Sequence, residues 1–336
     1  MNDADTHDAR SARPLVDLAA AVRRGERRAL ARAITRIESL RHDHQAEAEA
    51  MLERLLPHAG SAIRLGISGA PGAGKSTFIE ELGLRLTAAG KRVAVLAVDP
   101  SSRRSGGSIL GDKTRMARLG REPLAFIRPS PAGETLGGVA RRTREAGLLC
   151  EAAGFDVVVI ETVGVGQSET AVAEMVDSFL LLLSPGGGDE LQGIKRGIVE
   201  LADLIVVNKA DGALRSAAML AARDYANAVR FLRPATAAWT PRVLTCSALE
   251  GEGLDEVWQG VLDHRAALEA DGLLQRRRER QARSWLWSEV QAALAHALRS
   301  DDGSRRLMRE LEDATAAGRL LPTRAAERLL ATFRRA

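Results

Sequence analysis

The sequence predicts an α/β fold, a doubly wound and mostly parallel sheet with helical extensions at its N- and C-terminal ends. Between residues 62 and 265, short apolar runs alternate with helical segments, which is typical of parallel sheets covered by helices on both faces. Outside that zone, apolar residues recur at spacings of three and four, the period of amphipathic helices. We therefore expect an N-terminal helical segment (1–60), a sheet domain (61–265) and a C-terminal helical extension (266–336).

The two terminal segments are predicted to be helical on the same grounds. The N-terminal apolar stripes lie at 15–22, 30–37 and 51–56. The C-terminal extension carries a basic run at 276–280, which we interpret as a solvated helix face, and Pro322 marks a break between its later helices.

Seven apolar runs in the central zone are predicted to be strands. They occupy residues 63–67, 93–98, 125–127, 157–160, 179–183, 204–207 and 243–245. Short continuous runs of this kind are typical of strands that are buried on both faces of a parallel sheet.

The composition narrows the possible classes of function. The 336 residues include 48 basic and 44 acidic side chains, a net charge of +4 that does not by itself indicate nucleic-acid binding. Aromatic residues make up 3% of the chain, too few to build stacking platforms for single strands. The two cysteines, Cys150 and Cys246, exclude a disulfide framework and a cysteine-rich metal site, and we expect both to be core thiols.

Membrane insertion and secretion are not predicted. No apolar run approaches about 18 residues, and the N-terminus lacks the basic and apolar regions of a signal peptide. We expect a cytoplasmic protein that has neither a membrane nor a nucleic acid as its partner.

The strongest motif is GAPGAGKS at residues 69–76, which matches G-x-x-x-x-G-K-[ST] between an apolar run and a helical segment. Its glycines let the backbone wrap around a phosphate with the N–H groups pointing inward. Lys75 is expected to neutralise the β- and γ-phosphates, and Ser76 to bind Mg²⁺ through its hydroxyl group. The nucleotide-binding residues predicted here are Gly69, Gly72, Ala73, Gly74, Lys75, Ser76 and Thr77.

A second motif, N-K-A-D, follows the apolar run at 204–207 and indicates the base. The Asp211 carboxylate can accept two hydrogen bonds from the N1–H and amino groups of guanine, a pair that adenine does not offer. After the next run, the backbone of 247–249 can hold the guanine carbonyl. The base-binding residues predicted here are Asn208, Lys209, Asp211, Ser247, Ala248 and Leu249. The sequence therefore predicts GTP and GDP as ligands in preference to ATP.

Glu161 and Gly164 occupy the place of the Asp-x-x-Gly that senses the γ-phosphate in GTPases. A carboxylate at a strand end can hold Mg²⁺ or its water, and a glycine lets its N–H approach the phosphate. No glutamine directly follows Gly164, so we expect slow intrinsic hydrolysis.

Asp99 and Asp112 are further candidates for contact with Mg²⁺ or its waters, or for positioning the attacking water. A capping or turn role for each aspartate stays open. The glycine-rich stretch 186–195, which includes Lys195, is interpreted either as a nucleotide-sensing loop or as a simple turn between a strand and a helix.

Long blocks of the chain resemble a known family. They are GAPGAGKST, AVLAVDPSS, GGSILGDKTRM, FIRPSP, TLGGVA, VVVIETVGVGQSE, GGGDELQGIK and VNKAD. Together they are similar to the MeaB/ArgK-type GTPases, a SIMIBI-type branch of the P-loop NTPases, over roughly residues 10 to 300. Members of this family act as GTP-dependent chaperones of adenosylcobalamin-dependent acyl-CoA mutases, above all methylmalonyl-CoA mutase.

The resemblance implies a P-loop GTPase domain with a C-terminal extension that forms a homodimer. It implies that the protein gates the delivery of adenosylcobalamin to a mutase, protects and reactivates that enzyme, and is in turn stimulated by it. By position, Lys75, Ser76, Asp99, Asp112 and Glu161 line the phosphate and Mg²⁺ site, and Lys195 responds to the partner. The residues expected to bind the metal are Ser76, Asp99, Asp112 and Glu161.

Two other functions stay open at this point. The first is a GTPase that inserts a metal into another enzyme, although the chain lacks the Cys-x-Cys-Cys or His-rich tract that such sites usually need. The second is a nucleotide-gated adaptor for which hydrolysis is incidental, an interpretation that the missing glutamine after Gly164 permits.

Overall fold

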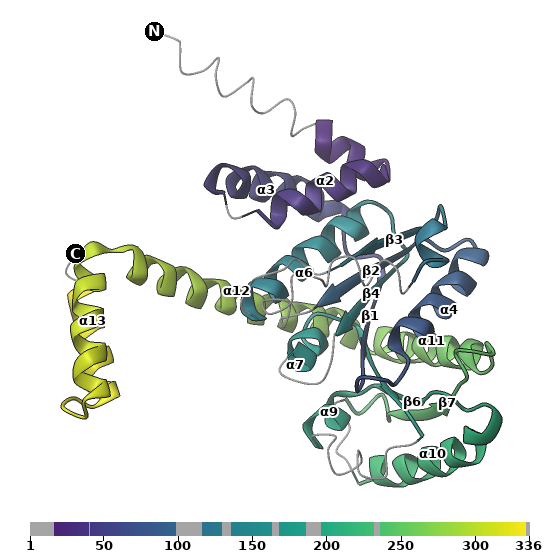
Figure 1. The fold of residues 1–336 in the computed structure, drawn as a ribbon. Helices are drawn as coiled ribbons and strands as arrows, with labels where there is room; N and C mark the ends of the chain where they lie inside the picture. Colours follow the sequence, from purple (N-terminus) through teal and green to yellow (C-terminus); the bar gives the residue numbers. More distant parts are fainter. Residues whose placement is uncertain are drawn as a thin grey trace. The chain divides into compact units, whose positions relative to one another are not determined.

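The computed structural model describes residues 17–39, 41–98, 116–129, 136–162, 168–185, 196–231 and 236–333. Its strands are β1 (Ile63–Ser68), β2 (Val93–Val98), β3 (Ala125–Arg128), β4 (Val157–Thr162), β5 (Ser178–Leu183), β6 (Leu204–Val207) and β7 (Arg242–Thr245). They form one sheet in the order β3-β2-β4-β1-β5-β6-β7, in which all neighbouring strands are parallel (Figure 1). The predicted doubly wound parallel sheet is confirmed.

Helices connect the strands and continue at both ends of the chain. They are α2 (Arg27–Ile37), α3 (His42–Leu55), α4 (Lys75–Ala88), α6 (Leu136–Ala152), α7 (Ser168–Ala173), α9 (Arg196–Leu201), α10 (Arg215–Val229), α11 (Leu254–Ala270), α12 (Leu273–Ser300), α13 (Asp302–Ala316) and α14 (Pro322–Phe333). Three short 3-10 turns are η1 (Leu56–His58), η2 (Leu119–Arg121) and η3 (Gly212–Leu214). The predicted break at Pro322 is the start of α14, where a proline fits because the first turn needs no N–H partner.

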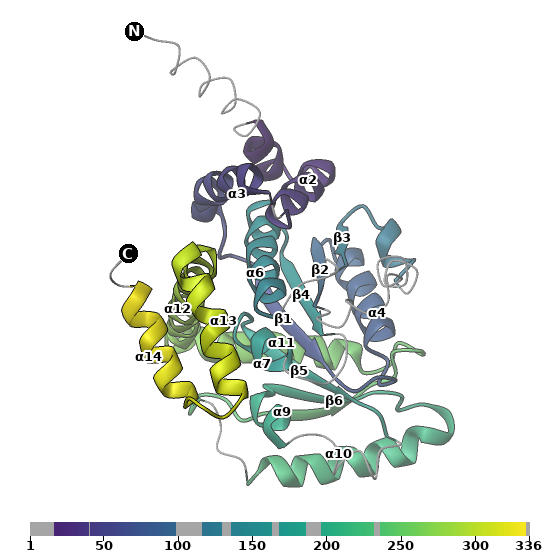
Figure 2. The same cartoon turned by 60° about the vertical axis from the view of Figure 1, so that its left-hand side comes forward.

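Two hydrophobic cores lie on the two faces of the sheet. Alternate residues of one strand point to opposite faces, so Val93 and Val95 of β2 join one core, and Ala94 and Leu96 join the other. The helices α4 and α11 cover the first face, whereas α6 and α7 cover the second, as Figure 1 and Figure 2 show from two directions. Burial on both faces explains why the strands appear in the sequence as unbroken apolar runs.

The helices α2 and α3 pack into the second core against α6. Leu30 and Ile34 of α2 and Met51 of α3 are fully buried in the same cluster as Val139 and Leu149 of α6. The N-terminal helical segment therefore shares its hydrophobic core with the sheet.

The chain divides into two compact units, Met1–Arg278 and Glu279–Ala336. The second unit holds most of α12, together with α13 and α14. The Asp301 carboxylate caps α13 by accepting a hydrogen bond from the Ser304 backbone N–H at 2.7 Å, and this bond holds the pKa of Asp301 below its ordinary value.

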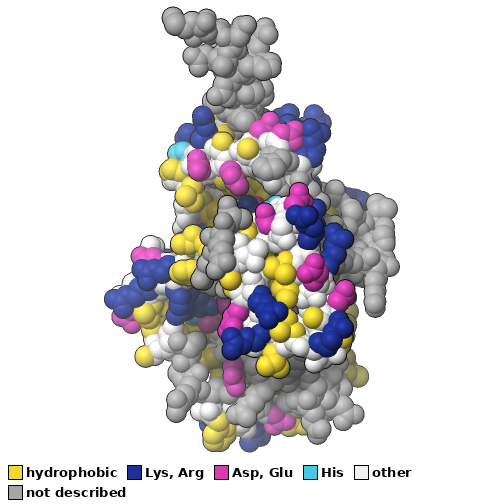
Figure 3. Space-filling model, turned by 90° about the vertical axis from the view of Figure 1, so that its left-hand side faces the viewer, with side chains coloured by type: hydrophobic (Ala, Val, Ile, Leu, Met, Phe, Trp, Pro, Cys, Tyr) yellow, Lys and Arg dark blue, Asp and Glu magenta, His cyan; other side chains and the backbone are white. Residues whose placement is uncertain are grey.

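The surface carries side chains of both signs. On the face drawn in Figure 3, basic and acidic groups are interspersed with hydrophobic ones among the described residues. Within that same part of the chain, no helix combines the length and apolar character needed to cross a membrane.

Candidate functional site

The candidate site lies at the carboxyl edge of the sheet, where β1 ends in the predicted phosphate loop. β1 is paired with β4 on one side and β5 on the other, so the loop emerges at the centre of the sheet. The register sets Ile67 of β1 opposite Glu161 of β4, which brings the two predicted phosphate-site segments to the same edge. This is the edge at which parallel α/β sheets bind ligands.

The loop requires glycine at two positions because other parts of the site approach it closely. A Cβ on Gly69 would lie 2.1 Å from the Leu182 carbonyl oxygen. Gly74 has a φ of +90°, and a Cβ there would lie 2.6 Å from Nδ2 of Asn208. The loop is therefore packed against β5 on one side and against the N-K-A-D motif on the other.

The first turn of α4 carries the predicted phosphate and magnesium ligands. The Lys75 Nζ donates to the carbonyl oxygens of Gly69 at 2.6 Å and Ala70 at 3.2 Å, so the ammonium group lies across the loop. The Ser76 hydroxyl donates to Oε1 of Glu161 at 3.4 Å, and Glu161 is buried. Two of the residues predicted as metal ligands, Ser76 and Glu161, therefore lie next to each other.

Asn208 connects the phosphate loop to the loop that follows β7. Its Nδ2 donates to the Ala73 carbonyl oxygen at 2.9 Å, while its Oδ1 accepts from the Ala248 N–H at 3.0 Å. The Cys246 Sγ also donates to Oδ1 at 3.5 Å. In the structure the Asn208 side chain holds two loops together, and its predicted contact with the base stays a prediction.

Asp211 and Ser247, two of the residues predicted to bind the base, are in contact. The Ser247 hydroxyl donates to Oδ2 of Asp211 and accepts from the Glu250 N–H at 3.0 Å. Among the non-glycine residues that the structure describes, Lys209 alone has a positive φ, of 59°, and this turn carries the chain from β6 to Asp211. The nearby Leu249 side chain is exposed.

Both cysteines are buried, as predicted for core thiols. Burial raises the pKa of the Cys246 thiol to about 12 and also raises the pKa of Cys150. Neither thiol has the thiolate character that a nucleophile needs.

Four predicted site residues lie outside the described part of the chain. They are Asp99, Asp112, Gly164 and Lys195. Their roles remain predictions.

One buried contact beside the site is not predicted by any motif in the sequence. The Thr162 hydroxyl donates to Oγ of Ser68 at 2.8 Å, both groups are fully buried, and they join the last residues of β4 and β1. The sequence shows a polar residue at the end of each of these two apolar runs. Only the strand order shows that β1 and β4 are neighbours, so that the two residues can meet.

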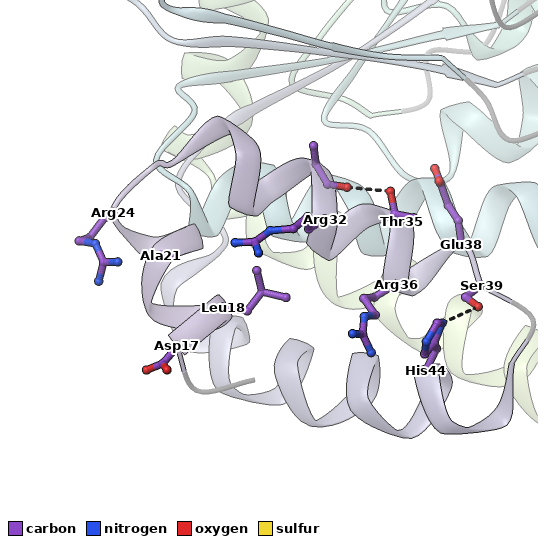
Figure 4. A pocket seen from close by; sticks show the side chains of 11 residues that line it. Asp17, Leu18, Ala21, Arg24, Arg32, Thr35, Arg36, Glu38, Ser39 and His44 are labelled. Atoms are coloured by element: carbon purple, nitrogen blue, oxygen red, sulfur yellow. Dashed lines mark hydrogen bonds between the residues drawn. The ribbon is translucent and has the colours of Figure 1, made fainter. Parts of the chain in front are cut away.

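A cavity lies in the N-terminal helices, apart from the candidate site. It has a volume of about 900 Å³ and is lined by residues of α2, of α3 and of the helical stretch that begins at Asp17 (Figure 4). Two of its arginines are already paired, Arg24 with Glu26 and Arg36 with Glu47. None of the predicted nucleotide-binding residues lines this cavity.

Comparison with known proteins gives a consistent result over nearly the whole chain. Residues 30–302 match the family model described as methylmalonyl Co-A mutase-associated GTPase MeaB. The GTPase ArgK of Escherichia coli is 52% identical over 285 residues, covering 84% of this chain and 86% of the relative. A mouse protein, the mitochondrial methylmalonic aciduria type A homolog, is 47% identical over 321 residues, covering 93% of this chain and 77% of its own.

A crystal structure of a LAO/AO transport system kinase is similar in fold. Its sequence is 40% identical, the match covers 99% of both chains, and the TM-score is 0.77.

Proposed function

Because the chain belongs to the family of methylmalonyl-CoA mutase-associated GTPases, we propose that it is a GTP-dependent chaperone of an adenosylcobalamin-dependent acyl-CoA mutase. The chain is a GTPase with a P-loop fold. In the proposed role, it binds methylmalonyl-CoA mutase or a related mutase and gates the delivery, protection and reactivation of the cofactor. The observation that carries the proposal is the family match over residues 30–302, which spans the phosphate loop and the N-K-A-D motif together.

In this proposal the residues divide into a phosphate group and a base group. Lys75 neutralises the β- and γ-phosphates, and Asp211 accepts the two guanine donors. Asn208 positions both loops through the contacts to Ala73 and Ala248. Asp99 and Asp112 contribute to the metal or to the attacking water, and Lys195 responds to the bound mutase.

The residues at the phosphate end fit a magnesium ion. The Ser76 hydroxyl and the buried Glu161 carboxylate lie 3.4 Å apart, and both present the oxygen ligands that Mg²⁺ prefers. A bound Mg²⁺ would neutralise charge on the phosphates. Ser76 would supply a ligand to the ion through its hydroxyl group, and Glu161 would hold the ion or one of its waters.

We further propose that the protein is a cytoplasmic homodimer. Exposed apolar side chains on α12 offer a surface for a second copy of the chain. The family description supports a mutase as a further partner. The choice among methylmalonyl-, isobutyryl-, ethylmalonyl- and hydroxyisobutyryl-CoA mutases is left to experiment.

The test is steady-state GTP hydrolysis by the purified protein, alone and with each of these mutases, and with ATP as the control nucleotide. We expect slow hydrolysis of GTP, none of ATP, and strong acceleration by one mutase. If no mutase binds or changes the rate, the chaperone proposal is wrong although the GTPase assignment stands. Tight stoichiometric binding of nickel or zinc in that case would favour a metal-insertion role.

A further inference from the structure

Glu80 lies on α4, one helical turn after Ser76, and fixes a distant part of the chain to this helix. Its Oε1 accepts hydrogen bonds from the backbone N–H groups of Arg118 at 2.8 Å and Leu119 at 3.3 Å. The Glu80 carboxylate is largely buried, with 11% of the side chain exposed. Separating the two N–H groups from this carboxylate would leave a buried negative charge without hydrogen bonds. The carboxylate therefore holds both N–H groups firmly.

The same segment also packs on α4 through apolar contacts. Leu119 is fully buried, and a Cβ placed on Gly83 would lie 2.6 Å from Cδ2 of Leu119. Met116, three residues earlier, is buried in the same core as Leu82. The absence of a side chain at Gly83 therefore leaves the space that Leu119 fills.

This anchor sits close to the predicted phosphate and magnesium ligands of α4. The first turn of the helix carries Lys75 and Ser76, and Glu80 lies only about 6 Å beyond Ser76 along its axis. The anchor thus fixes α4 one helical turn away from these two residues.

We propose that Glu80 is a positioning residue for GTP hydrolysis: by holding the segment at 116–119 on α4, it fixes the helix whose first turn carries Lys75 and Ser76. Glu80 is not among the residues proposed to bind the nucleotide or the metal. It acts through the Arg118 and Leu119 amides, so that the phosphate loop and the segment at 116–119 move as one body. The inference rests on GTP hydrolysis alone and does not depend on a mutase partner.

The neighbouring Glu81 provides a matched control. It forms an ion pair with the Arg118 guanidinium, but no bond from it to a backbone amide of the segment is present. Glu81→Ala therefore removes a charge pair from the same turn of α4 and leaves the anchor in place. Glu80→Ala removes the anchor together with the longer contact, 3.4 Å, from Glu80 to the Arg118 guanidinium. Glu80→Gln keeps an oxygen that can accept the two N–H bonds.

The experiment compares these three variants with the wild type in GTP turnover, in the Mg²⁺ concentration for half-maximal turnover, and in GDP affinity without Mg²⁺. We expect Glu80→Ala to lower kcat about tenfold or more, since a misplacement of about 1 Å can cost that much. We also expect it to need more Mg²⁺, while its GDP affinity stays within about twofold because the loop and base contacts are intact. Glu80→Gln should recover most of the rate, and Glu81→Ala should match the wild type.

Hydrogen exchange provides a readout that is independent of activity. In Glu80→Ala the amides of Arg118 and Leu119 should exchange faster, whereas in Glu81→Ala they should not. If Glu80→Ala does not fold, Gly83→Ala tests the same contact, because its Cβ displaces Leu119 without changing any charge; the same loss of turnover is expected.

Two results would overturn the proposal. One is a folded Glu80→Ala or Gly83→Ala protein that has the kcat and the Mg²⁺ requirement of the wild type. This result would show that Glu80 only stabilises the fold. The other is an equal loss of turnover in Glu80→Ala and Glu81→Ala, which would assign the effect to the Arg118 charge pair.

Discussion

Asn208 and Asp211 stand three residues apart in one motif, yet they contribute to the site in different ways. The Asn208 side-chain amide forms hydrogen bonds to the phosphate loop and to the loop after β7, so it holds these two loops in place. Asp211 has one carboxylate oxygen on the Ser247 hydroxyl, which orients it. A change at Asn208 should therefore affect every nucleotide, and a change at Asp211 only the choice of base.

Asp211→Asn should change the base preference from guanine to xanthine. An asparagine amide donates where the carboxylate accepted, and xanthine offers a carbonyl oxygen at the position of the guanine amino group. Loss of hydrogen bonds to a charged acceptor costs about 3 kcal/mol or more, which is roughly a hundredfold in GDP affinity. Competition binding with GDP and xanthosine diphosphate measures this change. Ser247→Ala is the control, with weaker GDP binding but no gain for xanthine. An unchanged GDP affinity in Asp211→Asn would contradict the assigned role.

Asn208→Ala should weaken all nucleotides together. It leaves the Ala73 carbonyl and the Ala248 N–H without their partner, at about 1–3 kcal/mol for each buried group. We expect a lower melting temperature and a similar fold loss for GDP, GTP and xanthosine diphosphate. Cys246→Ala removes the weak 3.5 Å thiol contact and a small buried group, so it should lower the melting temperature less and leave the nucleotide affinities near those of the wild type. A loss confined to guanine nucleotides would show that Asn208 acts on the base instead.

At the scale of elements, buried ion pairs hold the first turns of α12 at the amino edge of the sheet. Arg277 contacts the Asp203 carboxylate just before β6, and Arg278 contacts Asp177 just before β5, with closest distances of 3.1 and 2.7 Å. His264 of α11 joins the same cluster, 3.4 Å from Asp203. The basic run at 276–280 was interpreted as a solvated helix face; two of its arginines instead have mostly buried side chains and bind carboxylates.

His264, Asp203 and Ser178 also form a chain of contacts that resembles a hydrolytic triad. Ser178 lies 2.6 Å from Nδ1 of His264, and all three residues are buried. A nucleophile must reach its substrate, and Ser178 has no exposed surface. Because all three residues are buried, we interpret the cluster as one that stabilises the fold and not as a catalytic triad.

Asp203→Asn should weaken the fold at neutral pH and make it less sensitive to acid. Burial by itself raises the pKa of Asp203, but the hydrogen bond from His264 and the charge of Arg277 outweigh it, and the pKa lies below its ordinary value. A carboxylate with a lowered folded-state pKa stabilises the protein above pH of about 4, and this contribution is lost as the pH falls through the folded-state pKa.

At pH 7 we expect the substitution to cost about 3 kcal/mol, because it leaves Arg277 buried without its partner. Melting temperatures between pH 3 and pH 7 give the measurement, and the gap between wild type and variant should shrink toward acid. Asp263→Asn, at an exposed ion pair with Arg242, should have a much smaller effect. A gap that stays constant with pH would show that charge at Asp203 is not the cause.

At the scale of the whole molecule, the second compact unit has exposed apolar side chains of its own. The second unit, 279–336, exposes several large apolar side chains, including Trp287 and Leu294 on α12, with exposed fractions of 65% and 57%. They are seven residues apart and so lie on one face of the helix. Exposed apolar residues that share a helix face favour an interface with another chain.

Trp287→Glu combined with Leu294→Glu should convert the proposed dimer into monomers. Burying two charges at an interface that lacks partners for them is strongly unfavourable. Light scattering at several protein concentrations measures the mass, and GTP hydrolysis without a mutase should be unchanged because these residues belong to the other unit. Leu220→Glu, at an apolar residue of α10 with a similar exposure of 60%, is the control and should remain dimeric. A dimeric double variant, or a monomeric wild type, would contradict the proposed interface.

The linear sequence was sufficient for the fold class, the strands and the two nucleotide motifs. The runs at 93–98 and 204–207 coincide with β2 and β6, because a strand buried on both faces must be apolar throughout. The phosphate loop could likewise be predicted from the sequence, because its local backbone conformation requires glycine. The family resemblance, carried by long contiguous blocks, is confirmed by the match over residues 30–302.

Contacts between distant residues could be decided only by the tertiary structure. The strand order places β1 between β4 and β5, and that order brings Ser76 to Glu161 and Thr162 to Ser68. The same holds for Glu80, whose partners lie 38 and 39 residues away along the chain. A periodic pattern reports which face of an element is buried, but it carries no information about which other element covers that face. The sequence therefore determined the motifs that predict the chemistry of the site, whereas the contacts that hold their residues in position follow from packing alone.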